Sequence, residues 1–175
     1  PASGNLEAVS SSFNPLHERS GRMSRLELKI PPPLVGLLCA GLMYGIDSIC
    51  PQQWLAPPLA MAGGVLLAMV GIAIDLISVW QFSRARTTIN PLKPQSSSAL
   101  VTRGIYGYSR NPMYLGMLTI LCGWALYLGN LLALPCLPLF VAYLTRFQIV
   151  PEERVMASLF GTPFVDYCQR VRRWC

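Results

Sequence analysis

An uncharged apolar stretch, residues 55–74, constrains most strongly what this chain can fold into. A helix needs about 20 apolar residues to cross the hydrocarbon core of a bilayer, and this stretch contains no Asp, Glu, Lys or Arg. It lies inside a longer apolar segment, residues 54–82, and another apolar segment covers residues 30–49. Only 13% of the residues are charged, whereas a soluble domain usually has about 25%. We therefore expect a polytopic membrane protein.

Two further apolar segments, residues 112–128 and 131–149, are separated only by Gly129 and Asn130. This short connection favours a tight helical hairpin, so the fold class that we expect is all-α, a membrane helical bundle with about four transmembrane helices. Proline in a helix interior removes a hydrogen bond, and we expect Pro135 and Pro138 to kink the fourth helix. The alternative is a pair of buried helices in a soluble protein.

The basic residues predict the topology of the bundle. They fall before the first segment, between the second and third, and at or beyond the end of the fourth, whereas residues 50–53 and 129–130 contain no Lys or Arg. In chain order they include Arg19, Arg22, Arg25, Lys29, Arg84, Arg86, Lys93, Arg103, Arg110, Arg146, Arg154, Arg170, Arg172 and Arg173. By the positive-inside rule both termini are cytoplasmic. The net charge of +6 is then explained by topology and lipid headgroups, and not by nucleic acid.

The segments outside the apolar ones differ in character. Residues 1–22 are Ser-rich and weakly patterned, and we expect a disordered tail, either an upstream or an added extension, followed by a single domain over residues 23–175. Beyond the fourth segment, residues 155–160 and 164–174 have apolar side chains at helical spacing, and Gly161 between them can end a helix. We expect two short amphipathic helices at the cytoplasmic interface.

Histidine and cysteine usage restricts the chemistry. The single histidine, His17, lies in the N-terminal tail, which leaves the folded body without a histidine base or metal ligand. The six cysteines form no CxxC pair, and most lie in or beside apolar runs, where cysteine behaves as a small hydrophobic residue. We expect no metal and no disulfide.

Three features mark candidate sites. The connection at residues 83–111 is long for a compact domain, and Tyr, Arg and Asn side chains gather where it enters the third segment; an aromatic belt at the membrane interface is the alternative. Glu152 and Glu153 follow the fourth segment, where an acid pair can also simply be solvated at a helix start. Asp75 is an acid inside the second segment, and such residues are functional candidates by default.

Ordered motifs connect these features. Residues 100–106 read Leu-Val-Thr-Arg-Gly-Ile-Tyr, and residues 110–116 read Arg-Asn-Pro-Met-Tyr-Leu-Gly. A Glu-Glu pair, Phe160 and Gly161, Tyr167 and a basic ending follow in that order. Over residues 75–174 the chain resembles the isoprenylcysteine carboxyl methyltransferase family and its phospholipid methyltransferase relatives. Residues 87–91 resemble bacterial members, which implies the bacterial inner (plasma) membrane.

The resemblance implies an S-adenosylmethionine (SAM) site in the half of the chain from about residue 84 to 175. Carried over by position, the cofactor-binding residues are Ser98, Ala99, Leu100, Val101, Tyr106, Asn111, Pro112, Met113, Tyr114 and Glu152. Asn111 stands where the carboxyl methyltransferases have His, and Gln148 stands where eukaryotic enzymes have an Arg for the substrate carboxylate. We take Arg146, Gln148 and Arg110 as candidate catalytic residues.

We expect an enzyme that transfers a methyl group from SAM to a small lipophilic acceptor by in-line displacement. Alignment of the reactants can contribute about 7–11 kcal/mol, and without histidine we favour an anionic or readily deprotonated nucleophile. One alternative keeps the fold but uses NADPH to reduce a lipid, and another is a membrane scaffold or transport subunit. The methyltransferase prediction requires that the loop entering the third helix and the acid pair leaving the fourth converge on one pocket.

Overall fold

The computed structural model describes residues 27–84 and 100–175, and within these ranges it contains helices and no strands. The all-α prediction is therefore confirmed. In chain order the elements are α2 (Pro32–Ile49), α3 (Pro57–Arg84), η2 (Gly104–Gly107), α4 (Pro112–Leu128), η3 (Leu131–Ala133), α5 (Cys136–Leu144), η4 (Thr145–Ile149), α6 (Val150–Phe160) and α7 (Thr162–Arg170). The predicted N-terminal tail, residues 1–22, lies outside the described residues.

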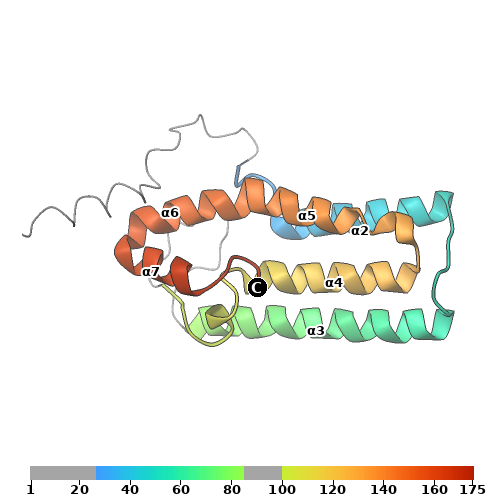
Figure 1. Ribbon diagram of the computed structural model, residues 1–175, viewed down its shortest axis with the longest axis horizontal. Coiled ribbons are helices and arrows are strands. Elements are labelled where there is room, and N and C mark those ends of the chain that lie inside the picture. The colour runs from blue at the N-terminus through green and yellow to red at the C-terminus, as the bar shows by residue number, and fades with distance from the viewer. Residues whose placement is uncertain (1–26, 85–99) are drawn as a thin grey trace, which may run out of the picture.

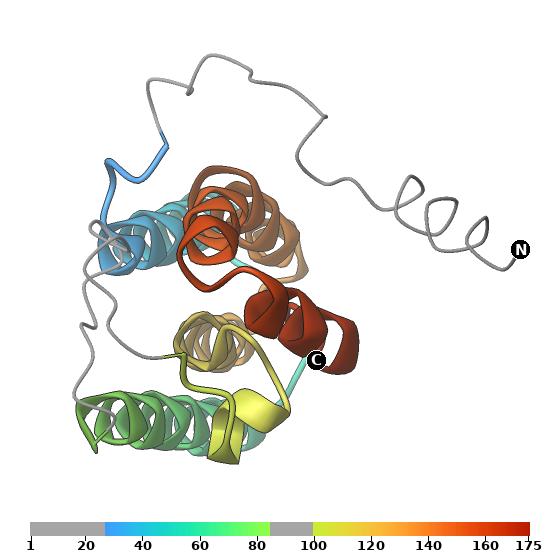
Figure 2. The same cartoon turned by 90° about the vertical axis from the view of Figure 1, so that its left-hand side faces the viewer.

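The four apolar segments of the sequence lie side by side along the bundle, with α4 between α3 on one side and α2 and α5 on the other (Figure 1, Figure 2). Within residues 27–84 and 100–175, three helical stretches are long and apolar enough to cross a membrane: Pro32–Ile49, Pro57–Arg84 and Leu131–Phe160. The helix α4 is also apolar but shorter, with 17 residues. Many large side chains on the outer faces are exposed, such as Leu37, Leu66 and Leu76, as expected where lipid covers the surface.

Paired glycines hold α3 against α4. A Cβ atom added at Gly64 would lie 2.7 Å from the backbone oxygen of Gly123, and one added at Gly71 would lie 2.6 Å from that of Gly116. The two glycines of α3 are seven residues apart, and so are the two glycines of α4. Because the helices run antiparallel, the two glycine pairs meet at two levels of the same interface. Small residues let transmembrane helices approach closely where no hydrophobic effect drives them together. We call this interface the glycine seam.

The hairpin between α4 and α5 turns on the two residues that the sequence places there. Gly129 adopts φ 64°, a left-handed conformation that favours glycine, and caps α4. The fully buried Asn130 side chain accepts a hydrogen bond from the Leu132 amide and donates to Asp47 Oδ1 at 2.9 Å and to the Cys50 carbonyl at 2.8 Å. The predicted hairpin is present, and the asparagine fastens it to the end of α2.

The last apolar segment departs from expectation in two ways. Pro135 precedes α5 and Pro138 lies in its first turn, so neither interrupts an intrahelical hydrogen bond, and the departure from a regular α-helix is the π-turn η4. The helix also does not end near residue 149; it continues through η4 into α6 and ends at Gly161, which has φ 56°.

Candidate functional site

A cavity of about 430 Å³ lies at the end of the bundle where α3 ends, α4 begins and α6 follows η4. We call this the basic end, because the described arginines lie at it. Cavities of this size bind small molecules and cofactors. The lining residues are Pro32, Pro33, Asp75, Val79, Phe82, Leu100, Val101, Tyr106, Arg110, Asn111, Pro112, Met113, Tyr114, Met117, Glu152, Glu153, Met156, Phe164 and Tyr167. The loop before α4 and the acid pair of α6 thus meet in one cavity, as the sequence predicted.

Glu152 is held from two sides. The Tyr114 hydroxyl, on α4, donates to Glu152 Oε1 at 2.6 Å, and Gln148 Nε2, one turn before Glu152, donates to the same oxygen at 2.7 Å. Tyr114 and Gln148 are both buried. Two donors on one oxygen fix the orientation of the Glu152 carboxylate at the cavity.

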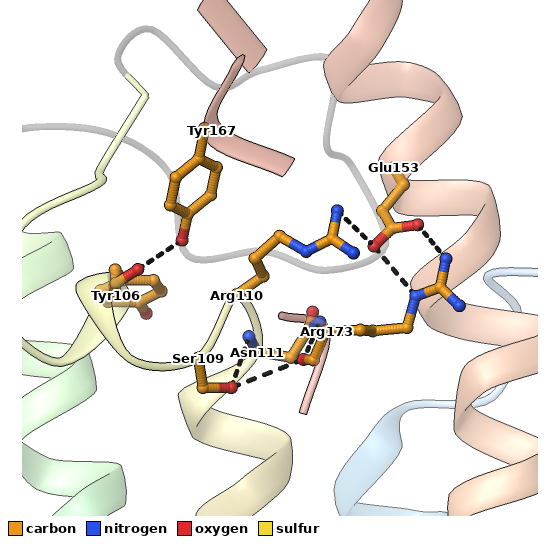
Figure 3. A network of polar contacts seen from close by, with 7 residues as sticks. All are labelled: Tyr106, Ser109, Arg110, Asn111, Glu153, Tyr167 and Arg173. Carbon is orange, nitrogen blue, oxygen red and sulfur yellow. Dashed lines mark hydrogen bonds and ion pairs between the residues drawn. The ribbon is translucent and has the colours of Figure 1, made fainter. Parts of the chain in front are cut away.

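Glu153 forms a second, ionic cluster (Figure 3). Arg173 binds it in a bidentate manner, with Nε 3.1 Å from Oε1 and Nη2 2.6 Å from Oε2. Arg110 Nη1 lies 3.2 Å from Oε1, and only 14% of the Arg110 side chain is exposed. Two guanidinium groups therefore neutralise Glu153, and the paired acids of the sequence have different environments.

The end of the chain is tied to the loop before α4. The Arg110 amide donates to the Arg172 carbonyl at 3.0 Å, and Asn111 Nδ2 donates to the Arg173 carbonyl at 2.9 Å. Trp174 Nε1 donates to Thr145 Oγ1 at 3.1 Å. The helix predicted over residues 164–174 therefore stops at Arg170, because residues beyond it serve as backbone partners for the loop.

Aromatic residues fix the short helix η2. The Tyr167 hydroxyl donates to the Tyr106 carbonyl at 2.7 Å (Figure 3), and the Phe82 and Tyr106 ring centroids lie 5.3 Å apart. The Ile105 amide donates to Gln81 Oε1 at 3.2 Å, which connects η2 to the end of α3. Burial raises the pKa of both tyrosine hydroxyls, Tyr106 and Tyr167, so both remain protonated donors.

Comparison with known proteins now decides the family. The model of the phospholipid methyltransferase family matches residues 59–163, a range that covers nearly all of α3 and the whole of α4, α5 and α6. The chain belongs to the phospholipid methyltransferase family. Within this family match lie most residues of the cavity, and only Pro32, Pro33, Phe164 and Tyr167 lie outside it.

Individual relatives agree with the family match. An uncharacterized protein of Haemophilus influenzae is 45% identical over 62 residues, 35% of this chain and 98% of that protein. Protein-S-isoprenylcysteine O-methyltransferase of Saccharomyces cerevisiae is 30% identical over 120 residues, 67% of this chain and 49% of the yeast protein. Protein-S-isoprenylcysteine O-methyltransferase B of Arabidopsis thaliana is 26% identical over 108 residues, 62% of this chain. This chain spans about half the length of the yeast and Arabidopsis proteins, and no solved structure matches it.

Most residues predicted from the family motifs lie in the cavity. Those that line it are Leu100, Val101, Tyr106, Arg110, Asn111, Pro112, Met113, Tyr114 and Glu152. Gln148 reaches the site through Glu152. Arg146 does not line the cavity: its side chain is 58% exposed and its Nη1 lies 3.3 Å from the buried Glu27. Ser98 and Ala99 lie outside the described residues.

The sequence motifs missed part of the apolar lining, including Val79 and Phe82 of α3. These two follow Asp75, which the sequence already marked as a candidate, at i+4 and i+7, so all three lie on one face of α3 that looks into the cavity. That spacing could have been found in the sequence. Pro32 and Pro33 at the start of α2 could not, because no local pattern connects them to residues eighty positions away.

The charges of the lining fit a ligand that carries cationic groups. Three acids, Asp75, Glu152 and Glu153, face the cavity with one arginine, Arg110. Three tyrosine rings contribute hydroxyl groups and aromatic faces, and an aromatic face attracts a cation within about 6 Å of its centroid.

Proposed function

We propose that this chain is an integral-membrane methyltransferase that moves a methyl group from SAM to a small lipophilic acceptor by in-line displacement. The acceptor group is a carboxylate, a thiol or a lipid headgroup. The observation that supports this most directly is the convergence of the Arg-Asn-Pro-Met-Tyr motif and Glu152 on one cavity. Beyond family membership, the proposal names SAM as the methyl donor, in-line displacement as the reaction, and the residues that bind the reactants.

The donor set of the cavity suits SAM, which carries an ammonium, a carboxylate, ribose hydroxyls and a sulfonium. In this proposal Glu152 binds the ammonium or the ribose hydroxyls, because Tyr114 and Gln148 already orient its carboxylate. Backbone amides at the start of α4 face the carboxylate, where the helix dipole favours negative charge. Leu100, Val101, Met113 and Tyr106 of the lining enclose the remainder.

SAM supplies a methyl group on a good leaving group, so the protein has mainly to hold, orient and dehydrate the reactants. The hydrogen bonds from Arg110 and Asn111 to the carbonyls of Arg172 and Arg173 hold in place the loop that lines the cavity. We expect Arg110 to act on the acceptor side, and Gln148 to act on the cofactor side by positioning Glu152. Arg146 lies outside the cavity, and we expect a role in holding Glu27.

The acceptor side of the cavity explains why such an enzyme lies in a membrane. Pro32 and Pro33 of α2 and Val79 of α3 form apolar walls near the start and end of their helices, so an alkyl chain can enter from between helices. We place the basic end on the cytoplasmic side by the positive-inside rule, in the bacterial inner membrane.

Thermal stabilisation of the detergent-solubilised protein tests the proposal. Ligands that bind only the native state raise the melting temperature, and the rise grows with the ratio of ligand concentration to dissociation constant. We expect S-adenosylhomocysteine to stabilise the protein and NADPH to have no effect. Stabilisation by NADPH alone would favour a lipid reductase, and no effect of either would favour a scaffold or transport subunit.

A further inference from the structure

Two arginines at the basic end lie outside the cavity and converge on one buried acid. Arg146 of η4 and Arg154 of α6 both reach Glu27, five residues before α2. Arg146 Nη1 lies 3.3 Å from Glu27 Oε1, and Arg154 Nη1 lies 3.4 Å from Oε2. Because one carboxylate joins them, the two guanidinium groups lie close together. We call Arg146 and Arg154 the arginine pair.

The fold fixes Glu27 beneath the arginine pair. Only 3% of the Glu27 side chain is exposed, and the next residue is bonded to η4, since the Leu28 amide donates to the Phe147 carbonyl at 3.1 Å. Pro151, four residues after Phe147, has no N–H to offer this carbonyl. The carboxylate is therefore anchored, and it brings the two arginines together before any ligand binds. Such preorganisation lowers the cost of binding.

Glu27 occupies little of the hydrogen-bonding capacity of the arginine pair. A guanidinium group has five N–H donors, and each arginine meets Glu27 through a single nitrogen. The side chains of Arg146 and Arg154 are 58% and 50% exposed, so the rest of each guanidinium group faces outward. Lys29, two residues after Glu27, is also exposed. Three cations therefore surround one acid on this surface.

The length of the last apolar stretch places the arginine pair at the level of lipid headgroups. Leu131–Phe160 has 30 residues and is about 45 Å long at 1.5 Å per residue, whereas the hydrocarbon core of a bilayer is about 30 Å thick. A stretch that enters the core at Leu131 leaves it after about 20 residues. Arg146 and Arg154 lie on either side of that level.

The surroundings of the arginine pair fit an anionic phospholipid. The helices α2 and α5 pack against each other and carry exposed leucines such as Leu34 and Leu139, so apolar surface adjoins the cations. Basic pockets between transmembrane helices at this interface bind anionic headgroups. A soluble anion would use only the cations. A zwitterionic headgroup would add a cation where Glu27, already paired, is the acid that the described residues supply.

We propose that the arginine pair binds the phosphate of an anionic phospholipid, whose acyl chains lie along the exposed leucines of α2 and α5. Each arginine donates hydrogen bonds to a non-bridging phosphate oxygen and keeps its contact with Glu27. Gln148 of the same η4 turn is buried and bonded to Glu152, so the lipid site and the cavity lie on different sides of η4. The inference involves neither SAM nor the methyl acceptor and is independent of the proposed function.

Titration of the detergent-solubilised full chain with three compounds tests the inference. Dioctanoyl phosphatidylglycerol, dioctanoyl phosphatidylcholine and glycerol phosphate are added separately, and the apparent affinity is read from thermal stabilisation. We expect wild type to bind phosphatidylglycerol about tenfold more tightly than phosphatidylcholine, because only the former has a net negative charge. Glycerol phosphate, which has the same charged group without acyl chains, should not stabilise the protein at the same concentrations.

A pair of double variants separates this site from general attraction to positive charge. Arg146→Gln with Arg154→Gln should weaken phosphatidylglycerol binding about 25-fold, since each cation near an anionic headgroup contributes about fivefold. Arg103→Gln with Arg170→Gln is the matched control, because it removes the same charge from two exposed arginines elsewhere at the basic end. The control should bind phosphatidylglycerol within about twofold of wild type. Circular dichroism checks that both variants keep their helices.

Three results would overturn the inference. Equal affinity of wild type for phosphatidylglycerol and phosphatidylcholine would show that the headgroup charge is not recognised, whether or not the variants fold. Stabilisation by glycerol phosphate equal to that by phosphatidylglycerol would show a site for a free phosphate. An equal loss of phosphatidylglycerol affinity in the two double variants would show diffuse attraction and no defined site at the arginine pair.

Discussion

The glycine seam and the basic end are held together by opposite means. In the seam, α3 and α4 approach until backbone atoms limit the distance, and glycines supply the room. At the basic end, the loop, α6 and the C-terminal residues are joined by ion pairs and hydrogen bonds between side chains and backbone. The difference shows that close packing positions the helices around the cavity, whereas directional polar contacts position the loop and side chains that line it. Substitutions should therefore affect the two regions in different ways.

The largest effect is expected in the seam. Gly71→Leu forces a side chain against the Gly116 oxygen and Ile120 of α4, and such overpacking should lower stability by about 3 kcal/mol. Gly41→Leu is the matched control, because Gly41 of α2 has no heavy atom near its added Cβ within 4 Å; it should change stability by less than about 1 kcal/mol. Thermal unfolding followed by circular dichroism measures both. Equal losses of stability in the two variants would show that α3 and α4 are not tightly packed at Gly71.

Glu153→Gln should have the next largest effect. It leaves the poorly exposed Arg110 without its ionic partner and removes the bidentate bond to Arg173, at an expected cost of about 2 kcal/mol. High salt should weaken mainly the pair with Arg173, whose side chain is 36% exposed, and should affect the pair with Arg110 less, because only 14% of that side chain is exposed. A stability equal to that of wild type would show that the ion pairs contribute nothing to the basic end.

Tyr167→Phe removes one hydrogen bond and no packing. The lost bond to the Tyr106 carbonyl should cost about 1 kcal/mol. Tyr108→Phe is the matched control. Because Tyr108 is 83% exposed, this variant should unfold at the same denaturant concentration as wild type. Denaturant titration of the two variants side by side separates them, and identical midpoints would contradict the account.

The smallest effect is expected at Glu27. Glu27 itself is buried, but its arginine partners, Arg146 and Arg154, are 58% and 50% exposed. Water therefore screens both guanidinium groups, and pairs of this kind contribute less than about 1 kcal/mol. Glu27→Gln should therefore melt within a few degrees of wild type. If Glu27→Gln lost as much stability as Glu153→Gln, solvent exposure of the arginines would not explain the difference expected between the two ion-pair clusters.

The sequence predicted more of the scaffold than of the site. Hydropathy predicted the apolar helices and the hairpin at Gly129, because these depend on local composition and spacing. The expected separate short helix over residues 155–160 instead continues directly from the fourth apolar segment through a π-turn, which needs no proline or glycine and leaves no local signal.

Motifs predicted which polar residues approach the cavity, but not how they pair. Glu152 and Glu153 are neighbours in sequence, yet Tyr114 binds one and Arg173 the other. Those partners come from elements that meet only in the folded chain. The same reason applies to Pro32 and Pro33, whose approach to the cavity depends on the packing of α2.

The dissociation constant of S-adenosylhomocysteine, measured by isothermal titration calorimetry on wild type, Glu152→Ala and Tyr114→Ala, tests the central claim most directly. The account predicts that wild type binds, and that both variants lose binding while circular dichroism shows intact helices. Unchanged affinity in both variants would contradict it, because the cavity at the basic end would then not be the cofactor site.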